Sequence, residues 1–229
     1  MPARYPLMAE PAGPPAAPPL SRRQRLKAQT RKALYQSALR LFAERGLAAA
    51  TVQDITLAAG VAKGTFFSHF RTKEEVFQPF FETLLANVAE VLRDVDAAVT
   101  GVRLALRHLF ERNAREFGRD PVLIRALFSS IFLNETVRGM MAEAMASGRR
   151  DLVRIIAAGQ KSGEIRADRE TRAMALAFQQ ALLGAVLVWA VRPAGSLSQR
   201  VETSFGDFWA AIAANGKGRP APRTGGSLL

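Results

Sequence analysis

Apolar residues recur every three or four positions along most of this chain, which is the spacing of amphipathic helices rather than strands. The first stripe consists of Leu34, Ala38, Leu41 and Phe42. Gly46 stands where this helix, which starts near Arg22, is expected to end. The segment from Thr51 to Asp54 has the form of a capping box and predicts a second helix that runs through Ala59.

A tight turn at Gly60 separates the second helix from a third, predicted from Lys63 to Phe70. Three short helices, the last two joined by a glycine turn, have the proportions of a helix-turn-helix. Later helices are predicted over residues 74–95, 101–117, 122–132, 135–162, 168–191 and 198–214. Few alternating β-branched runs compete with them. We therefore expect an all-α fold, in which a three-helix N-terminal helix-turn-helix domain precedes a C-terminal helical bundle.

Composition sets the expected domain limits. The first residues are rich in proline and alanine, the last ones in glycine and basic residues, and neither end shows helical periodicity. We expect a disordered arm at residues 1–21, the helix-turn-helix domain at 22–73, the larger helical domain at 74–215 and a disordered tail at 216–229.

The net charge of +12 is concentrated in the helix-turn-helix region. Residues 21–73 carry 11 Lys and Arg against only Glu44 and Asp54, whereas residues 74–215 carry 17 charges of each sign. A general richness in arginine explains the number of cations but not this clustering. A local basic block favours a polyanionic partner such as nucleic acid.

Several classes of site are excluded or disfavoured by composition. The chain has no cysteine, so disulfides and thiol nucleophiles are excluded, and its only histidines are His69 and His108, so we expect no metal site. We find no catalytic constellation and no glycine-rich phosphate loop, and we expect neither an enzyme nor a cofactor. The longest apolar run, residues 181–191, is about half of a membrane span, and no secretory signal is visible. These features predict a cytoplasmic protein without a membrane partner.

The third predicted helix has an unusual outer face. If Phe66 and Phe70 point inward, Gly64 and Ser68 point directly away from them. A helix surface that is small and polar at its centre can approach the floor of the DNA major groove closely. The alternative, that Gly64 is merely tolerated, costs about 1 kcal/mol relative to alanine inside a helix.

These motifs resemble the DNA-binding domain of TetR-type transcriptional regulators. The resemblance covers roughly residues 25–76 and is carried by the segments LF-AERG (41–46), TVQDI (51–55), AAGVAKGTFF (58–67) and SHFRTKEE (68–75). It implies a homodimer of all-helical subunits, each with a three-helix DNA reader and a larger domain that binds an inducer and dimerises.

The resemblance also implies which residues contact double-stranded DNA at an operator. They are Thr51, Lys63, Gly64, Thr65, Phe67, Ser68, His69 and Lys73. Two positions depart from the usual pattern of the family, which has Tyr at Phe67 and Ser or a similar cap at Ala62. Thr51 is first a helix cap, and His69 fits a packing role as well as a phosphate contact.

The larger domain offers apolar volume with a few polar residues embedded in it, which suits a small hydrophobic effector. The candidate ligand-binding residues are Leu106, Phe110, Asn113, Leu127, Phe128, Phe132, Met145 and Phe178. The alternative is that these aromatic and methionine stripes are ordinary core.

The segments 173–191 and 201–212 are expected to form a four-helix dimer interface with the same pair of a second subunit, because the first is apolar nearly all round. The candidate interface residues are Leu182, Val186, Trp189, Phe205, Phe208 and Trp209.

Together these features predict a ligand-responsive repressor that binds a palindromic operator as a dimer and is released by the effector. Two rival hypotheses are a basic protein that coats DNA without sequence preference, and a helical carrier or enzyme for a hydrophobic molecule. The first predicts a steep salt dependence without a preferred palindrome, and the second predicts ligand binding without any effect on DNA.

Overall fold

A computed structural model describes residues 21–191 and 196–214. The arm predicted over residues 1–21, apart from Ser21, and the tail predicted over 216–229 lie outside the described residues. Within the described residues the chain is all-α, as predicted, with one isolated antiparallel bridge between Ile165 and Ala213. The helices are α1 (Arg22–Arg45), α2 (Val52–Ala58), α3 (Lys63–Phe67), the 3₁₀ helix η1 (Glu74–Phe77), α4 (Gln78–Asp96), α5 (Val102–Arg119), α6 (Pro121–Leu133), α7 (Glu135–Ser162), α8 (Thr171–Val191) and α9 (Leu197–Ile212).

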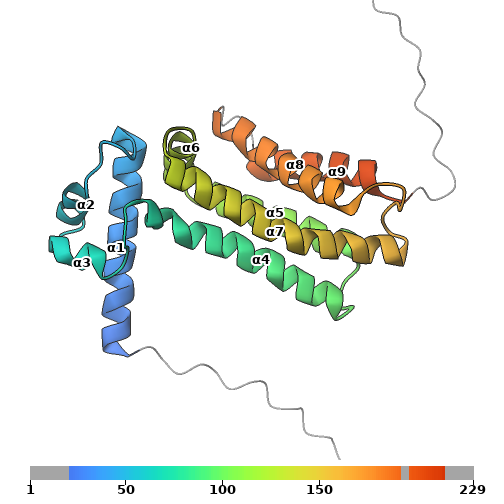
Figure 1. Cartoon of the computed structure of the whole chain (residues 1–229), viewed down its shortest axis with the longest axis horizontal. Coiled ribbons are helices and arrows are strands. Elements are labelled where there is room, and N and C mark those ends of the chain that lie inside the picture. Colours follow the sequence, from blue (N-terminus) through green and yellow to red (C-terminus); the bar gives the residue numbers. More distant parts are fainter. Residues whose placement is uncertain (1–20, 192–195, 215–229) are drawn as a thin grey trace, which may run out of the picture.

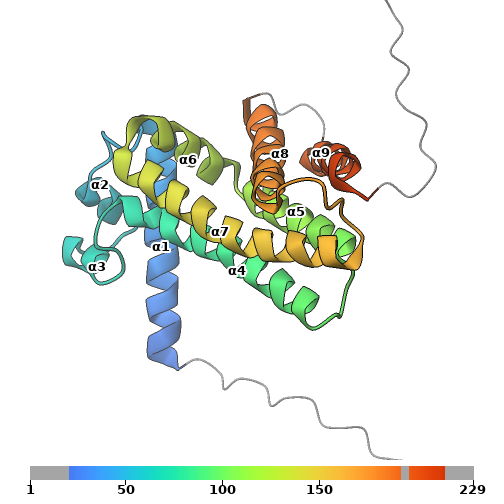
Figure 2. The same ribbon diagram turned by 45° about the vertical axis from the view of Figure 1, so that its right-hand side comes forward.

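The helices form a small group at one end and a longer bundle beside it. Figure 1 shows α1 standing across the end of the long helices α4 and α7, with α2 and α3 on the far side of α1. In the bundle α4 packs on α7 and α5, while α8 packs on α9 and α7 (Figure 2). Helix α6 packs against α1 and so joins the two groups a second time, beside the direct connection through η1.

The helix end predicted at Gly46 and the capping box predicted at Thr51 are both present in the structure. The Thr51 hydroxyl accepts a hydrogen bond from the backbone N–H of Asp54 at 3.1 Å, and Asp54 accepts one from the backbone N–H of Thr51 at 3.0 Å. This is the predicted capping box of α2. Gly46 ends α1 with a φ of 82°, a backbone conformation that favours glycine.

Two predicted helices differ from the observed ones. The stretch from Glu74 starts as the 3₁₀ helix η1, and the α-helix α4 begins at Gln78, because Pro79 has no N–H to donate and suits only a first turn. The predicted third helix ends at Phe67 rather than Phe70. There the Ser68 hydroxyl donates to the Thr65 carbonyl at 2.7 Å, a local bond that competes with the helical ladder.

Long-range contacts fix the ends of the bundle helices. The Glu164 carboxylate accepts hydrogen bonds from the free backbone N–H groups of Val102 and Arg103, at 2.9 and 3.1 Å, and so caps α5 from a distant loop. Gly163, with a φ of 78°, ends α7 one residue before it. The two ends therefore stabilise each other.

Among the described residues, α8 is the one helix that is long and apolar enough, by length and composition, to cross a membrane. The core helix of a globular protein has the same properties. Six residues of α8 are buried within this chain: Met174, Ala175, Phe178, Leu182, Ala185 and Val186. Helix α8 therefore serves as a core helix of the bundle on at least one face.

Candidate nucleic-acid interface and ligand cavity

Helices α2 and α3 form a compact helix-turn-helix unit. Gly60 takes a φ of 68°, and the backbone N–H of Val61 donates to the Thr56 carbonyl at 3.0 Å, which closes the end of α2. Phe66 of α3 is fully buried, and its ring lies 5.5 Å from that of Phe70. The inward orientation predicted for these two phenylalanines is confirmed, and it fixes which face of α3 points outward.

The outward face of α3 is small and open. Lys63 and Gly64 are exposed, and a Cβ atom placed on Gly64 would meet no heavy atom within 4 Å. The chain itself therefore imposes no need for glycine there. Phe67 is 54% exposed, and Ser68 is exposed beside it. This face of α3 is therefore not covered by other described residues and is open to a partner.

His69 lies at the junction of α3 and α1. Its Nδ1 atom is buried and has no hydrogen-bond partner within the described residues. Burial lowers the pKa of His69, and the nearby charges of Lys27 and Arg31 lower it further. A neutral imidazole is thus favoured, which supports the packing role over a charged phosphate contact.

Lys73 makes hydrogen bonds within the chain, and its contact with DNA stays a prediction. Its Nζ donates to the carbonyl oxygens of Leu47, Ala48 and Ala50 at 2.6, 3.2 and 3.1 Å. These three bonds occupy all three donors of the ammonium group and tie η1 to the loop between α1 and α2. In the free chain Lys73 is a structural residue, and a phosphate contact would have to replace bonds already made.

Thr51 is occupied in a similar way, because its hydroxyl donates to the Asp54 carboxylate at 2.6 Å. Hydrogen bonds from the side chain and backbone of Thr51 lower the pKa of Asp54. The cap role predicted for Thr51 is confirmed, and its contact with DNA stays a prediction. Four cations are exposed at the start of α1, and the sequence predicts that they reach the DNA backbone or minor groove, which stays a prediction: Arg22, Arg23, Arg25 and Lys27.

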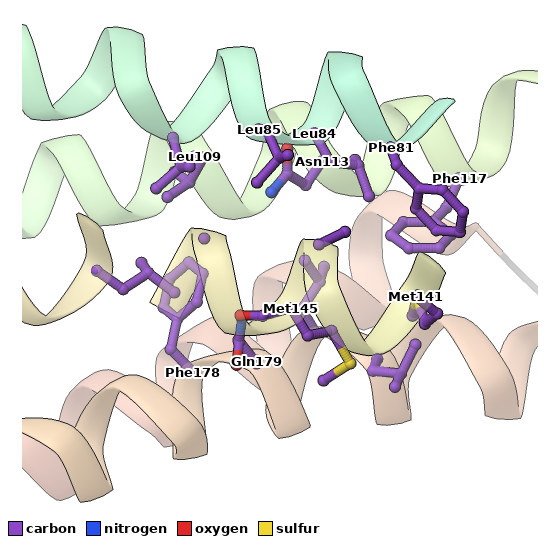
Figure 3. Close-up of a pocket in the computed structure, with 16 residues that line it drawn as sticks. Phe81, Leu84, Leu85, Leu109, Asn113, Phe117, Met141, Met145, Phe178 and Gln179 are labelled. Atoms are coloured by element: carbon purple, nitrogen blue, oxygen red, sulfur yellow. The ribbon is translucent and has the colours of Figure 1, made fainter. Parts of the chain in front are cut away.

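The bundle contains an apolar cavity of about 90 Å³ between α4, α5, α7 and α8 (Figure 3). Three predicted ligand-binding residues line it: Asn113, Met145 and Phe178. The lining residues that sequence reasoning missed are Phe81, Leu84, Leu85, Val88, Leu109, Phe117, Met141, Ala144, Gly148, Leu152, Gln179, Leu182 and Leu183. The lining residues of α4, from Phe81 to Val88, belong to an apolar stripe that the sequence shows. The stripe does not indicate which helix it packs against.

The other five predicted ligand-binding residues do not line this cavity. Leu106, Phe110 and Leu127 are fully buried in ordinary core, and the Phe110 ring packs 5.2 Å from that of Phe178 and 5.6 Å from that of Phe205. Phe128 is partly buried, and Phe132 is 72% exposed. Helix α6 packs against α1 and α7, so its residues lie outside this cavity, and a ligand contact for any of the five stays a prediction.

The six residues predicted for the dimer interface fall into a buried group and a partly exposed group. Leu182, Val186, Phe205 and Phe208 are buried within this chain, and Leu182 lines the cavity, so these four belong to the core of their own bundle. Trp189 and Trp209 are partly exposed. The apolar residues that α8 leaves exposed are Leu176, Leu187, Val188 and Val191, which are the opposite face of the same helix. The face of α8 that was predicted for the interface therefore packs within its own bundle, and the place of a dimer interface stays a prediction.

Two hydrogen-bonded amides interrupt the apolar cavity wall. The Asn113 Oδ1 accepts from Asn87 Nδ2 at 2.9 Å, and Asn87 Oδ1 accepts from Arg112 Nη2 at 3.0 Å. On the opposite wall, Gln179 Nε2 donates to the Met145 carbonyl at 2.7 Å and Gln179 Oε1 accepts from Arg149 Nε at 2.9 Å. None of the described residues that line the cavity is ionisable.

Comparison with known proteins agrees with this architecture. Residues 34–79 match the family model described as "Bacterial regulatory proteins, tetR family". The chain is 32% identical over 143 residues to the HTH-type transcriptional repressor DhaR of Mycobacterium sp. (strain GP1), a match that covers 60% of this chain and 71% of that protein. It is 29% identical over 175 residues to the HTH-type transcriptional repressor KstR2 of Rhodococcus jostii (strain RHA1), with 75% and 84% covered.

A solved structure extends the similarity to most of the described chain. It is Thermus thermophilus FadR, a TetR family transcriptional repressor in complex with lauroyl-CoA. The two proteins are 26% identical, with a TM-score of 0.57, and the match covers 86% of this chain and all of the other.

Proposed function

The chain belongs to the tetR family of bacterial regulatory proteins and is a helix-turn-helix transcriptional regulator; we propose that it is a ligand-responsive repressor that binds a palindromic operator as a homodimer. One observation carries the proposal. A single helix, α4, both forms a wall of the cavity and continues directly from the helix-turn-helix unit through η1. A molecule in the cavity therefore acts on the helix that supports the DNA reader.

The exposed face of α3 is the proposed reading surface. Gly64 leaves room for the backbone of α3 to approach base edges, with Thr65 and Ser68 as small polar contacts. Lys63, at the start of α3, is exposed and suited to a phosphate, while Phe67 contacts the sugar-phosphate wall through apolar surface. The cations at the start of α1 extend this basic surface.

The proposed dimer forms through α8 and α9. Four apolar residues of α8 are exposed on one face, and the neighbouring exposed face of α9 carries small residues such as Gly206 and Ala210. Small residues allow the helices of two subunits to pack closely, and burial of the α8 face removes apolar surface from water. A dimer places two readers about 34–36 Å apart, on one face of the duplex.

The proposed effector site is the cavity between α4, α5, α7 and α8. Its volume of about 90 Å³ is smaller than the ~300–1,000 Å³ of typical ligand pockets. An effector of ordinary size must therefore widen it. Met141 and Met145 are flexible side chains that can repack, but Leu84, Leu85 and Val88 belong to α4 itself. Widening of the cavity thus displaces α4.

Displacement of α4 is transmitted to the reader by aromatic packing. Phe77, at the end of η1, is fully buried, and its ring lies 5.7 Å from that of Phe42 in α1. A shift of α4 therefore moves α1, the α2 that packs on α1 and the α3 that packs on α2, and changes the separation of the two readers in the dimer. Coupling of this kind is reciprocal and typically amounts to ~1–3 kcal/mol.

The same reading implies a cytoplasmic protein that needs no cofactor and has no enzymatic activity. Selection of binding sites from random duplex DNA, at low and at near-physiological salt, tests the function. We expect an inverted repeat that survives the higher salt. Binding without a consensus that disappears with salt would instead indicate a protein that coats DNA, and ligand binding without DNA binding would indicate a carrier.

A further inference from the structure

The two amides in the cavity wall present a defined chemistry to an effector. An amide side chain has a donor NH₂ group and an acceptor oxygen. Which ligand groups it prefers therefore depends on which of these two ends faces the ligand. Here that choice is made by arginines outside the cavity, because a guanidinium group can only donate.

Arg112 sets the orientation of Asn113 through Asn87. The Arg112 Nη2 donates to Asn87 Oδ1 at 3.0 Å and to Glu90 Oε2 at 2.7 Å. Since Asn87 must accept with its oxygen, its nitrogen is left to donate, and it donates to the Asn113 oxygen at 2.9 Å. The oxygen of Asn113 is thus occupied, and its nitrogen is the end of the amide that can donate to an effector. Figure 3 shows this nitrogen pointing away from α4, toward the space between the helices.

Gln179 is oriented by the same principle from the opposite wall. Its oxygen accepts from Arg149 Nε at 2.9 Å, and one of its two N–H bonds is used by the Met145 carbonyl at 2.7 Å. Reversal of the amide would place its NH₂ group against the guanidinium and its oxygen against a carbonyl. The second N–H of Gln179 is thus a further donor at the cavity.

From these contacts we infer that the effector carries an uncharged hydrogen-bond acceptor, a carbonyl, ether or hydroxyl oxygen on a hydrophobic body, which receives the amide N–H of Asn113. The inference rests on the proposed function of the cavity as the effector site. A charged group has no counter-ion among the described lining residues, so its desolvation would be uncompensated. A purely hydrocarbon ligand would cover the Asn113 donor without satisfying it.

The same contact gives the acceptor a direct connection to the reader. Asn113 belongs to α5, and the residue that binds its oxygen, Asn87, belongs to α4. An acceptor held by Asn113 is therefore one hydrogen bond away from the helix that connects the cavity to the helix-turn-helix unit. Asn87 and Arg112 are positioning residues, because they act through Asn113 rather than on the ligand.

Pairs of compounds that differ only in the acceptor test the inference. Acetophenone and α-methylstyrene have the same shape, with C=O in one and C=CH₂ in the other, and octanophenone with its methylene analogue forms a longer pair. We expect each ketone to bind about tenfold more tightly than its alkene partner by calorimetry. We expect the ketones to release operator DNA at correspondingly lower concentration, and benzoate to bind far more weakly than acetophenone.

Three variants locate the preference. Asn113→Leu is expected to bring the ketone affinity down to that of the alkene, and Arg112→Met to reduce the preference because Asn87 and Asn113 are then free to turn. Leu109→Val, on the same wall of the cavity, is the matched control and should change the affinities for both members of a pair equally. DNA binding without ligand and the thermal midpoint serve as checks of folding.

The outcomes separate this inference from the proposed function. If ketone and alkene release DNA equally well, the cavity is an effector site without the acceptor preference, and the inference is wrong. Benzoate binding as tight as that of acetophenone would also overturn it. If no compound of either length binds or affects DNA, the proposed function of the cavity fails as well.

Discussion

At the scale of single residues, the two lysines that flank α3 have different roles although the sequence presents them alike. Lys73 donates to three carbonyl oxygens of the α1–α2 loop, whereas Lys63 is exposed at the start of α3. A charge that is already bonded within the chain is a poor candidate for counterion release, because contact with a phosphate must first break those bonds.

The pair Lys73→Met and Lys63→Met tests this difference. We expect Lys73→Met to lower the free energy of unfolding by about 1–3 kcal/mol, because the carbonyl oxygens lose a charged donor. Lys63→Met should leave stability unchanged but reduce the salt slope of DNA binding by about one. Denaturant unfolding and DNA affinity over a range of salt measure both effects. A reduced salt slope for Lys73→Met would restore Lys73 as a phosphate contact.

At the scale of elements, Gly64 and Gly148 lie inside helices at positions where packing within the chain does not require a glycine. A Cβ on Gly64 of α3 would meet nothing within 4 Å, whereas a Cβ on Gly148 of α7 would lie 3.7 Å from Leu85 Cδ2 and 4.0 Å from Gln179 Nε2, at the cavity. Both sites accept alanine without a clash inside the chain. Any loss of function on substitution therefore reports a partner or a ligand.

Gly64→Ala is expected to weaken DNA binding without weakening the fold. Alanine favours the helix over glycine by up to about 1 kcal/mol, so the free energy of unfolding should be equal or higher. Its methyl group would stand on the surface that approaches the groove, and we expect at least a tenfold loss of operator affinity. Anisotropy titration and denaturant unfolding measure the two quantities. Unchanged affinity would mean that this face of α3 does not enter the groove.

Gly148→Ala is expected to reduce effector affinity, because its methyl group occupies part of a cavity of only about 90 Å³. Gly139→Ala, in the same helix but exposed and without neighbours within 4 Å, is the matched control for helix propensity. Both should stabilise α7 slightly. Only Gly148→Ala should raise the effector concentration needed to release DNA, and an equal response of both variants would argue against this cavity.

At the scale of the whole molecule, the fold leaves one apolar helix face uncovered. Helix α8 buries Phe178, Leu182 and Val186 in its own bundle, and still exposes Leu187 and Val188 on its other side. A helix that is apolar on both faces needs a partner on each. In the proposed repressor that partner is α8 and α9 of a second subunit, which also sets the spacing of the two readers.

Val188→Asp is expected to convert the dimer to a monomer, because a carboxylate would be buried at the centre of the interface. Val188 is 54% exposed in one subunit, so the bundle itself should stay folded. Val99→Asp, at a residue 74% exposed beyond the end of α4, is the matched control and should remain dimeric. Sedimentation gives the oligomeric state and anisotropy the DNA affinity. A dimer that survives Val188→Asp would exclude this face.

Features that depend on neighbouring residues follow from the amino-acid sequence alone. The all-α class, the end of α1 at Gly46, the capping box of α2 and the inward phenylalanines of α3 follow from periodicity and from hydrogen bonds within a few positions. The third helix was predicted too long only where Ser68 makes a competing local bond.

The side that an apolar or polar residue faces depends instead on how the helices pack in space. Leu182 and Phe205 read as interface residues, and Phe132 as a cavity residue, because a helical stripe shows that a side is apolar without showing what covers it. The bonds of Lys73 and of Asn113 join positions 23 to 26 residues apart. Core, cavity and interface are separated by helices that meet in space but not in sequence, and that is information that no local pattern contains.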